Sequence, residues 1–320
     1  MRVGIYFDLR NPPGWRREWP ELYGRALEQI EEAERLGVGS VWVSEHHGFD
    51  DGYMGQPLLA CAAIAARTSR VRIGTAVLVA PLRPPIDIAE QAAMVDILSG
   101  GRLELGLGAG YRIPEFALFG QDVKQRFALL EERVREVRRM WGDGSATPAP
   151  VQEPLPMWLG VIGPRGARLA GRLGTGLLWL SPRLMTPYRE GLEEGGHDPA
   201  QARCGGLLNL FLADDPEAAR AQVKPYADYQ RSSYARYAAE GRGDSRPATR
   251  ALSTDEDPGF AVVTPEEAAE RVRTTLAELP VSDVFLWASI GGMPDELSDR
   301  HVELVATRLA PALAGGGLAA

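Results

Sequence analysis

The stretch Val41-Trp42-Val43-Ser44-Glu45-His46-His47 carries the strongest signal in this sequence. Its three apolar residues predict a buried strand, and half of the four histidines in the chain follow directly at the end of that strand. In barrels of parallel strands, catalytic groups lie at the carboxyl ends of the strands, and an imidazole titrates near neutral pH. The stretch therefore predicts an enzyme whose active site lies at the end of this strand.

Composition limits the class of protein. The chain has 320 residues, 45% of them hydrophobic, which is enough for one large α/β domain or two smaller ones. A net charge of −8 argues against nucleic acid or an anionic membrane surface as a partner. Two cysteines, Cys61 and Cys204, are no disulfide framework and favour a reducing compartment. No apolar run of about 18 residues is present, so we expect a cytoplasmic protein without a signal peptide or membrane span.

Predicted strands and helices alternate along the chain. The expected strands are 3–9, 40–44, 72–79, 103–107, 157–161, 176–180, 206–212 and 281–288. The expected helices are 20–36, 57–68, 85–98, 127–141, 163–173 and 295–309, with two more starting near 215 and 264. Eight strands, mostly followed by helices, favour a closed (β/α)8 TIM barrel in a single domain, 1–320, over an open doubly wound sheet. The stretch 240–261 has no periodicity and is expected to be an irregular excursion or lid before the last strand.

The glycine-rich run Gly106-Leu107-Gly108-Ala109-Gly110 resembles a dinucleotide-binding fingerprint only superficially. That fingerprint needs a helix that starts inside the run, whereas Tyr111-Arg112-Ile113-Pro114 follows here, and the run lies in the fourth strand–helix unit instead of the first. A Rossmann site for a nicotinamide cofactor is therefore disfavoured. Glycines at a strand end also allow a flat ligand to approach the backbone closely.

Several motifs occur together in a fixed order. They are Ser44-Glu45-His46-His47, Gly74-Thr75-Ala76-Val77-Leu78-Val79-Ala80-Pro81, Leu98–Tyr111, Glu115-Phe116 and Phe119-Gly120. In this order and spacing the sequence resembles the bacterial-luciferase-like flavin-dependent oxidoreductases, strongly over residues 3–141 and more loosely over 156–174 and 264–309. The resemblance implies a (β/α)8 barrel that binds a flavin at the carboxyl ends of its strands, in agreement with the strand count.

The resemblance assigns His46 as the active-site histidine. In luciferase-like monooxygenases this residue lies near the flavin C4a region and supports the C4a-peroxyflavin intermediate, and an imidazole can donate or accept the protons concerned. The alternative is a histidine at the barrel rim that is satisfied by Glu45 or by a backbone carbonyl. Because successive side chains alternate along a strand, His47 should point to the opposite face. The two histidines are thus a poor chelating pair, and no metal is predicted.

Two further segments are expected to contact the cofactor. Ala76-Val77 matches the position where many family members have a non-prolyl cis peptide bond beneath the flavin ring, although an ordinary apolar strand is the alternative. Ala109, Gly110 and Tyr111 are expected beside the cofactor at the end of the fourth strand, with Arg112 nearby. Luciferase subunits proper have an arginine where this chain has Ala109, which weakens any expectation of light emission or of an identical phosphate site.

The phosphate of the flavin has a candidate site at a helix start. Gly163-Pro164-Arg165-Gly166 precedes an expected helix whose first amides could bind a phosphate. Arg165 would add a charge-assisted contact, and a solvent-exposed arginine is the alternative.

An apolar substrate pocket is expected at the barrel mouth. Residues at or just past the predicted strand ends would line it: Phe7, Met54, Trp179, Ser181, Trp287 and Met293. Each aromatic side chain could equally pack between strand and helix. A closed apolar pocket would keep water from the peroxyflavin, with the 240–261 excursion as the lid.

Three functions are consistent with these observations. The first is a monooxygenase that uses O2 and reduced FMN, supplied in trans by a separate flavin reductase, to oxygenate a small, largely apolar organic substrate. The Glu-His-His form of the motif is more typical of FMN users. The second is a coenzyme F420-dependent oxidoreductase that transfers hydride without oxygen; that branch often carries Asp-His here, and Ala109 is compatible with either. The third is a non-catalytic flavin-binding subunit of a heterodimer, against which His46 argues. Because barrels of this family commonly pair, a homodimer is expected.

Overall fold

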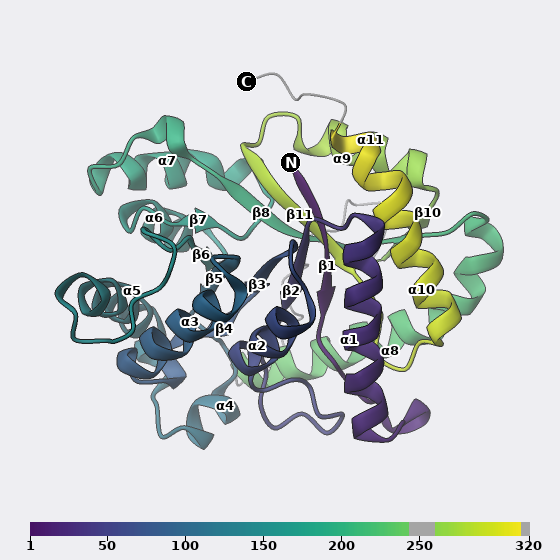
Figure 1. The fold of residues 1–320 in the computed structure, drawn as a ribbon, viewed down its shortest axis with the longest axis horizontal. Helices are drawn as coiled ribbons and strands as arrows, with labels where there is room; N and C mark the ends of the chain where they lie inside the picture. The colour runs from purple at the N-terminus through teal and green to yellow at the C-terminus, as the bar shows by residue number, and fades with distance from the viewer. Residues whose placement is uncertain (243–259, 315–320) are drawn as a thin grey trace.

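Parallel strands form a closed barrel in the computed structural model, which describes residues 1–242 and 260–314 (Figure 1). Neighbouring strands follow the order β3-β2-β1-β11-β8-β7-β6-β5, and β5 pairs back with β3. The short β4 continues the course of β3 and also pairs with β5. The strands are β1 Arg2–Phe7, β2 Ser40–Val43, β3 Arg72–Thr75, β4 Leu78–Val79, β5 Leu103–Gly108, β6 Met157–Gly160, β7 Gly176–Leu177, β8 Cys204–Leu208 and β11 Val281–Trp287. The expected (β/α)8 barrel is confirmed.

Helices surround the barrel, and their ends follow the local sequence. α1 ends at Gly37, whose positive φ of 106° suits glycine, and α9 begins with the reciprocal hydrogen bonds of a capping box between Thr264 and Glu267. The larger helices are α1 Trp19–Leu36, α2 Pro57–Arg67, α3 Pro85–Ser99, α5 Arg126–Asp143, α6 Pro164–Arg172, α7 Met185–Glu194, α8 Pro216–Arg242, α9 Pro265–Leu276 and α10 Asp295–Leu304. The short helices are α4 Ile113–Leu118 and α11 Ala310–Ala314. No helix of the described part of the chain is long and apolar enough to cross a membrane.

Several expected elements are shorter or divided. The strand expected over 72–79 is interrupted between β3 and β4, where the Ala76–Val77 peptide bond is cis. The strand expected over 206–212 starts at Cys204 and divides, because β9 (Leu210–Leu212) pairs with β10 (Ala261–Val263) beside the barrel. The last helix changes at Val305 into a π-helical turn. Of the expected excursion 240–261, residues 243–259 lie outside the described residues.

Bulky and charged side chains fill the amino-terminal end of the barrel. Trp42 and Trp158 are fully buried in the interior, and a Cβ atom at Gly74 or Gly176 would lie 2.2 Å from one of their rings. Below them Glu104 accepts hydrogen bonds from Arg2 at 2.8 Å, Arg72 at 2.9 Å and Trp158 at 2.8 Å. This end of the barrel is therefore a packed core, which leaves the opposite end for ligands.

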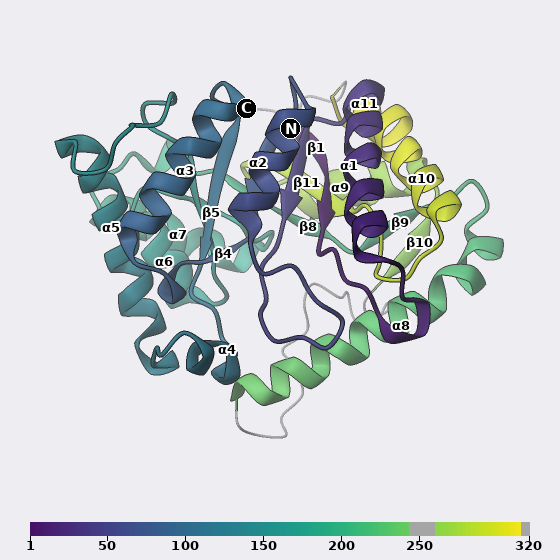
Figure 2. The ribbon, with the colours of Figure 1, turned by 60° about the horizontal axis from the view of Figure 1, so that its bottom comes forward.

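The long helix α8 lies across that opposite end, where the strands terminate (Figure 2). Polar contacts attach it to the rim: Tyr229 donates to Asp51 at 2.8 Å, Tyr237 donates to Asp50 at 2.9 Å, and Glu240 pairs with Arg112 at 2.7 Å. In the described part of the chain, α8 therefore covers the barrel mouth, and it precedes most of the excursion expected at 240–261.

Candidate active site

His46 lies just beyond β2 at the barrel mouth and is held by a buried carboxylate. Its Nδ1 is 2.7 Å from Oε1 of Glu115 in α4, and its backbone N–H donates to the Met54 carbonyl at 3.0 Å. The Glu115 side chain is fully buried, and 12% of the His46 side chain is exposed. Because the carboxylate accepts the Nδ1 proton, Nε2 is the imidazole atom that can meet a ligand. The partner of His46 is therefore Glu115, and neither Glu45 nor a backbone carbonyl.

His47 contacts a different carboxylate. Its Nε2 is 2.6 Å from Oε1 of Glu45, and its ring packs edge-on against Phe119 with a centroid separation of 4.7 Å. The two imidazoles thus diverge, as strand alternation predicts. Within residues 1–242 and 260–314, no three side chains of His, Cys, Asp or Glu are grouped to hold a metal ion.

Aromatic rings enclose the His46 imidazole. Phe49 stacks on it at 4.7 Å, and Tyr53 and Tyr111 meet it edge-on at 4.8 and 5.5 Å. Tyr234 of α8 contributes a fourth ring at 6.4 Å and shares a 2.8 Å hydrogen bond with the Tyr53 hydroxyl. Burial raises the pKa of Tyr53 and of Tyr234 well above the usual value, so both phenols stay neutral. These aromatic rings therefore shield most of the imidazole from solvent.

A buried charged cluster beside these aromatic rings anchors α8. Arg10 forms a 2.6 Å ion pair with Asp51 and a hydrogen bond with Ser233 of α8. The Arg10 guanidinium lies over several aromatic rings, including Tyr53 at 5.4 Å. Burial raises the pKa of the neighbouring Asp8 to about 6, while the charge of Arg10 opposes this shift. Sequence reasoning missed this cluster, whose members come from three distant segments.

The segment after β3 forms the apolar floor of the mouth. Ala76 and Val77 are half-buried among otherwise buried neighbours, and Ala76 donates its N–H to the Val43 carbonyl at 2.7 Å. A Cβ atom at Gly108 or Gly160 would lie 2.3 or 2.4 Å from a Val77 methyl group. These glycines therefore make room for the Val77 side chain. The sequence favours the close approach of a ligand as the reason for the glycine run. The structure gives another reason, which is space for the Val77 side chain.

The end of β5 lies beside His46. Ala109 is buried, Gly110 is half-buried, and Tyr111 is 36% exposed with its ring edge-on to the imidazole. Arg112 donates to the His47 carbonyl at 2.6 Å and pairs with Glu240. Arg112 is therefore bound to the protein's own groups, whereas Tyr111 faces the mouth.

The expected phosphate site follows β6 at the same end of the barrel. Gly163 precedes the first turn of α6, Arg165 is exposed, and Gly166 is buried against Val161. Ile162, just before this turn, is 63% exposed. The amides of the first turn of α6 and the Arg165 side chain are thus available to an anionic group.

The six expected substrate residues do not share one environment. Trp287 belongs to the barrel interior, edge-on to Tyr6 at 4.7 Å, and Ser181 is half-buried before α7. Phe7, Met54 and Trp179 pack in or against the larger apolar cluster, and their contact with a substrate stays a prediction. Strand alternation turns Tyr6 towards the barrel interior and Phe7 away from it.

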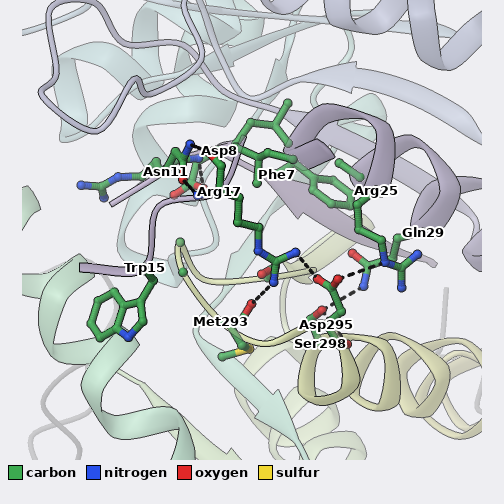
Figure 3. Close-up of a pocket in the computed structure, with 17 residues that line it drawn as sticks. Phe7, Asp8, Asn11, Trp15, Arg17, Arg25, Gln29, Met293, Asp295 and Ser298 are labelled. Carbon is green, nitrogen blue, oxygen red and sulfur yellow. Dashed lines mark hydrogen bonds and ion pairs between the residues drawn. The ribbon is translucent and has the colours of Figure 1, made fainter. Parts of the chain in front are cut away.

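Met293, the sixth, is buried and lines a cleft outside the barrel together with Phe7 (Figure 3). The cleft lies between the segments that follow β1 and β11. Arg17 crosses it to reach Asp295 at 2.7 Å and the Met293 carbonyl at 3.3 Å.

Comparison with known proteins identifies the family. Residues 1–283 match the sequence profile described as luciferase-like monooxygenase. The chain belongs to this family. The luciferase-like protein is 33% identical over 197 residues to an F420-dependent glucose-6-phosphate dehydrogenase from Amycolatopsis mediterranei, covering 55% of this chain and 59% of that one. It is 30% identical over 210 residues to the oxygenase component of a flavin-dependent trigonelline monooxygenase from Acinetobacter baylyi, covering 61% of this chain and 56% of that one.

The chain thus spans less than two thirds of the length of either relative. Among solved structures, the monooxygenase RslO1 from Streptomyces bottropensis superposes with a TM-score of 0.80 over 97% of this chain and 99% of its own, at 24% identity, which shows the shared barrel fold. The resemblance drawn from the sequence is confirmed, because the chain is a member of the luciferase-like monooxygenase family. Its relatives divide between flavin-dependent monooxygenases and F420-dependent dehydrogenases.

Proposed function

We propose that this protein is a monooxygenase that uses reduced FMN and O2 to oxygenate a small, largely apolar organic substrate. The observation that carries the proposal is the His46–Glu115 pair, which presents one imidazole nitrogen to an apolar barrel mouth. A separate flavin reductase would supply the reduced FMN, because one of the relatives is named as the oxygenase component of a flavin-dependent monooxygenase.

The residues present at the mouth suit a flavin. The half-buried Ala76 and Val77 offer an apolar surface at the end of β3, and the Tyr111 ring lies edge-on to His46. The start of α6 with Arg165 suits the terminal phosphate of FMN. When bound there, FMN would supply the electrons that activate oxygen.

The protein's own groups would control protons and water. With Nδ1 bound to Glu115, the imidazole would exchange a proton with a ligand through Nε2. Phe49, Tyr53 and the Tyr234 ring of α8 exclude water around this atom.

A second candidate is an F420-dependent oxidoreductase that passes hydride without oxygen. The similarity to an F420-dependent dehydrogenase supports it, and the same mouth would hold the deazaflavin ring.

Titration of the purified protein with FMN and, separately, with F420 tests the choice between these candidates. We expect reduced FMN to bind and to consume oxygen faster when apolar substrates are added. Tight binding of F420 alone would overturn the FMN assignment. Binding of FMN with no oxygen consumption by the isolated protein would instead support a non-catalytic subunit that needs a catalytic homologue.

A further inference from the structure

We propose that Glu45 is a positioning residue that fixes the apolar floor, Ala76–Val79, on which the flavin ring would lie. This inference rests on the proposed function, because it assigns Glu45 a purpose in holding the cofactor. Glu45 directly precedes His46, so neighbouring residues of one segment would hold the proposed proton-handling group and the apolar floor.

The Glu45 carboxylate has three donors around it. Oε1 accepts from Arg83 Nη1 at 2.6 Å and lies 2.6 Å from His47 Nε2. Oε2 accepts the backbone N–H of Val79 at 2.6 Å. The Glu45 side chain is fully buried, and 6% of the Arg83 side chain is exposed. These contacts leave the carboxylate a single orientation.

Hydrogen bonds fix the apolar floor at both of its ends, Ala76 and Val79. At its front, Tyr6 donates to the Ala76 carbonyl at 3.2 Å, and Ala76 donates to Val43 at 2.7 Å. At the Val79 end, β4 pairs with β5, and the Val79 N–H donates a hydrogen bond to Glu45. Removing that acceptor would leave a buried amide without a partner and free the Val79 end of the floor to shift.

Stability alone does not account for a buried ion pair at this place. Well-packed apolar residues of similar volume commonly stabilise a fold as well as a buried ion pair does. A carboxylate differs from an apolar side chain in that it fixes the direction of each donor around it. The distinctive contribution of Glu45 is therefore the placement of Val79.

Two matched double variants separate this role from a purely structural one. E45Q/R83M and E45L/R83M both remove the buried charges, but only the glutamine keeps an acceptor for the Val79 N–H. We expect the leucine variant to bind FMN about tenfold more weakly than the glutamine variant, the lower end of what the loss of a supporting hydrogen bond causes at preorganised sites. Without any cofactor, amide hydrogen exchange over 76–82 should be faster in the leucine variant.

Equal FMN affinity together with equal exchange in the two variants would overturn the proposal. If the leucine variant does not fold, Glu45→Asp serves instead, because it keeps the charge but withdraws the carboxylate by one methylene group from Val79. Unchanged exchange and affinity in Glu45→Asp, relative to the unmodified protein, would also overturn it. If the unmodified protein binds F420 and not FMN, the proposed function fails, while the same comparison made with F420 still decides the role of Glu45.

Discussion

At the scale of single residues, the pairing of His46 with Glu115 separates two properties of the site. The carboxylate fixes the ring through Nδ1, and Nε2 is left to meet a ligand. In the proposed function, flavin binding would depend on surfaces such as Ala76 and Val77, whereas proton control would depend on the imidazole. The two properties should therefore respond differently to substitution.

His46→Ala is expected to retain FMN binding but to release the consumed oxygen as hydrogen peroxide. Loss of a positioned general acid or base typically costs about 10²- to 10⁴-fold in the step it serves. Product yield per oxygen consumed, measured with an oxygen electrode and a peroxidase assay, checks this. His197→Ala, which removes an exposed histidine, is the matched control. An unchanged product yield in His46→Ala would refute the catalytic role.

The sequence predicted His46 but not its partner. His46 follows a recognisable apolar strand and carries a family motif, so its position at the mouth follows from local sequence. Glu115 is 69 residues away, and only the fold brings it to the imidazole. The local sequence shows Glu115 only as an acidic residue in the first turn of a short helix, which does not identify it as the partner of His46. The outward direction of Phe7 could have been predicted from the inward position of Tyr6 by alternation.

At the scale of elements, the fully buried His301 joins β9 to β11. Leu212 of β9 donates its N–H to Nδ1 at 2.8 Å, and Nε2 donates to the Trp287 carbonyl at 2.9 Å. These two contacts fix a neutral ring, and burial lowers the pKa of His301 to about 4. Protonation would remove the acceptor for Leu212 and place a charge in the core.

Acidification is therefore expected to destabilise the protein through His301. The unfolded chain takes up this proton near pH 6.5, whereas the folded chain does so near pH 4, so this contribution is complete above pH 6.5 and is lost as the pH falls to about 4. The pKa difference corresponds to about 3 kcal/mol in the free energy of unfolding. Urea unfolding at several pH values checks this, with His301→Gln as the variant that should lack the contribution. Identical pH dependence in both proteins would contradict it.

Most strands and helices could be predicted from their periodicity, but their interruptions could not. Periodicity within residues 72–79 does not indicate the break after Thr75, whereas the match to the family motif predicted the cis peptide bond at Ala76–Val77 that lies there. The division of the 206–212 strand depends on β10, about 50 residues further along the chain. The position of α8 across the mouth depends on contacts such as Tyr229 with Asp51, 178 residues apart.

At the scale of the whole molecule, two neighbouring helices on the outside of the barrel carry large exposed apolar side chains. Leu59 of α2 is 71% exposed, and Met94 and Leu98 of α3 are 47% and 55% exposed. α2 and α3 lie side by side on the same face (Figure 1). Exposed apolar groups gathered on neighbouring helices are typical of an interface between subunits.

We expect the protein to form a homodimer through the outer faces of α2 and α3. The double variant L59R/L98R should shift the molecular mass in solution towards that of the monomer, because it places charges in an apolar contact. Sedimentation or light scattering measures this mass. Val151→Arg, at a side chain that is 59% exposed elsewhere, is the control. A monomeric unmodified protein would contradict the prediction.

The closed barrel itself could be predicted, because eight strands in regular alternation with helices fit a (β/α)8 barrel better than an open sheet. The position of α8 across the mouth was not predicted, and most of the lid expected at 240–261 lies outside the described residues. A helix such as α8 is attached by side chains from distant segments, and hydrophobic periodicity does not indicate which distant residues will contact it.

The tryptophans and the Glu104 charge cluster that fill the amino-terminal half of the barrel have a kinetic consequence. Because this end of the barrel is filled, a ligand of the proposed site can reach it only from the end that α8 crosses. If cofactor and substrate both bind there, we expect the one that lies nearer the tryptophans to bind first and to leave last.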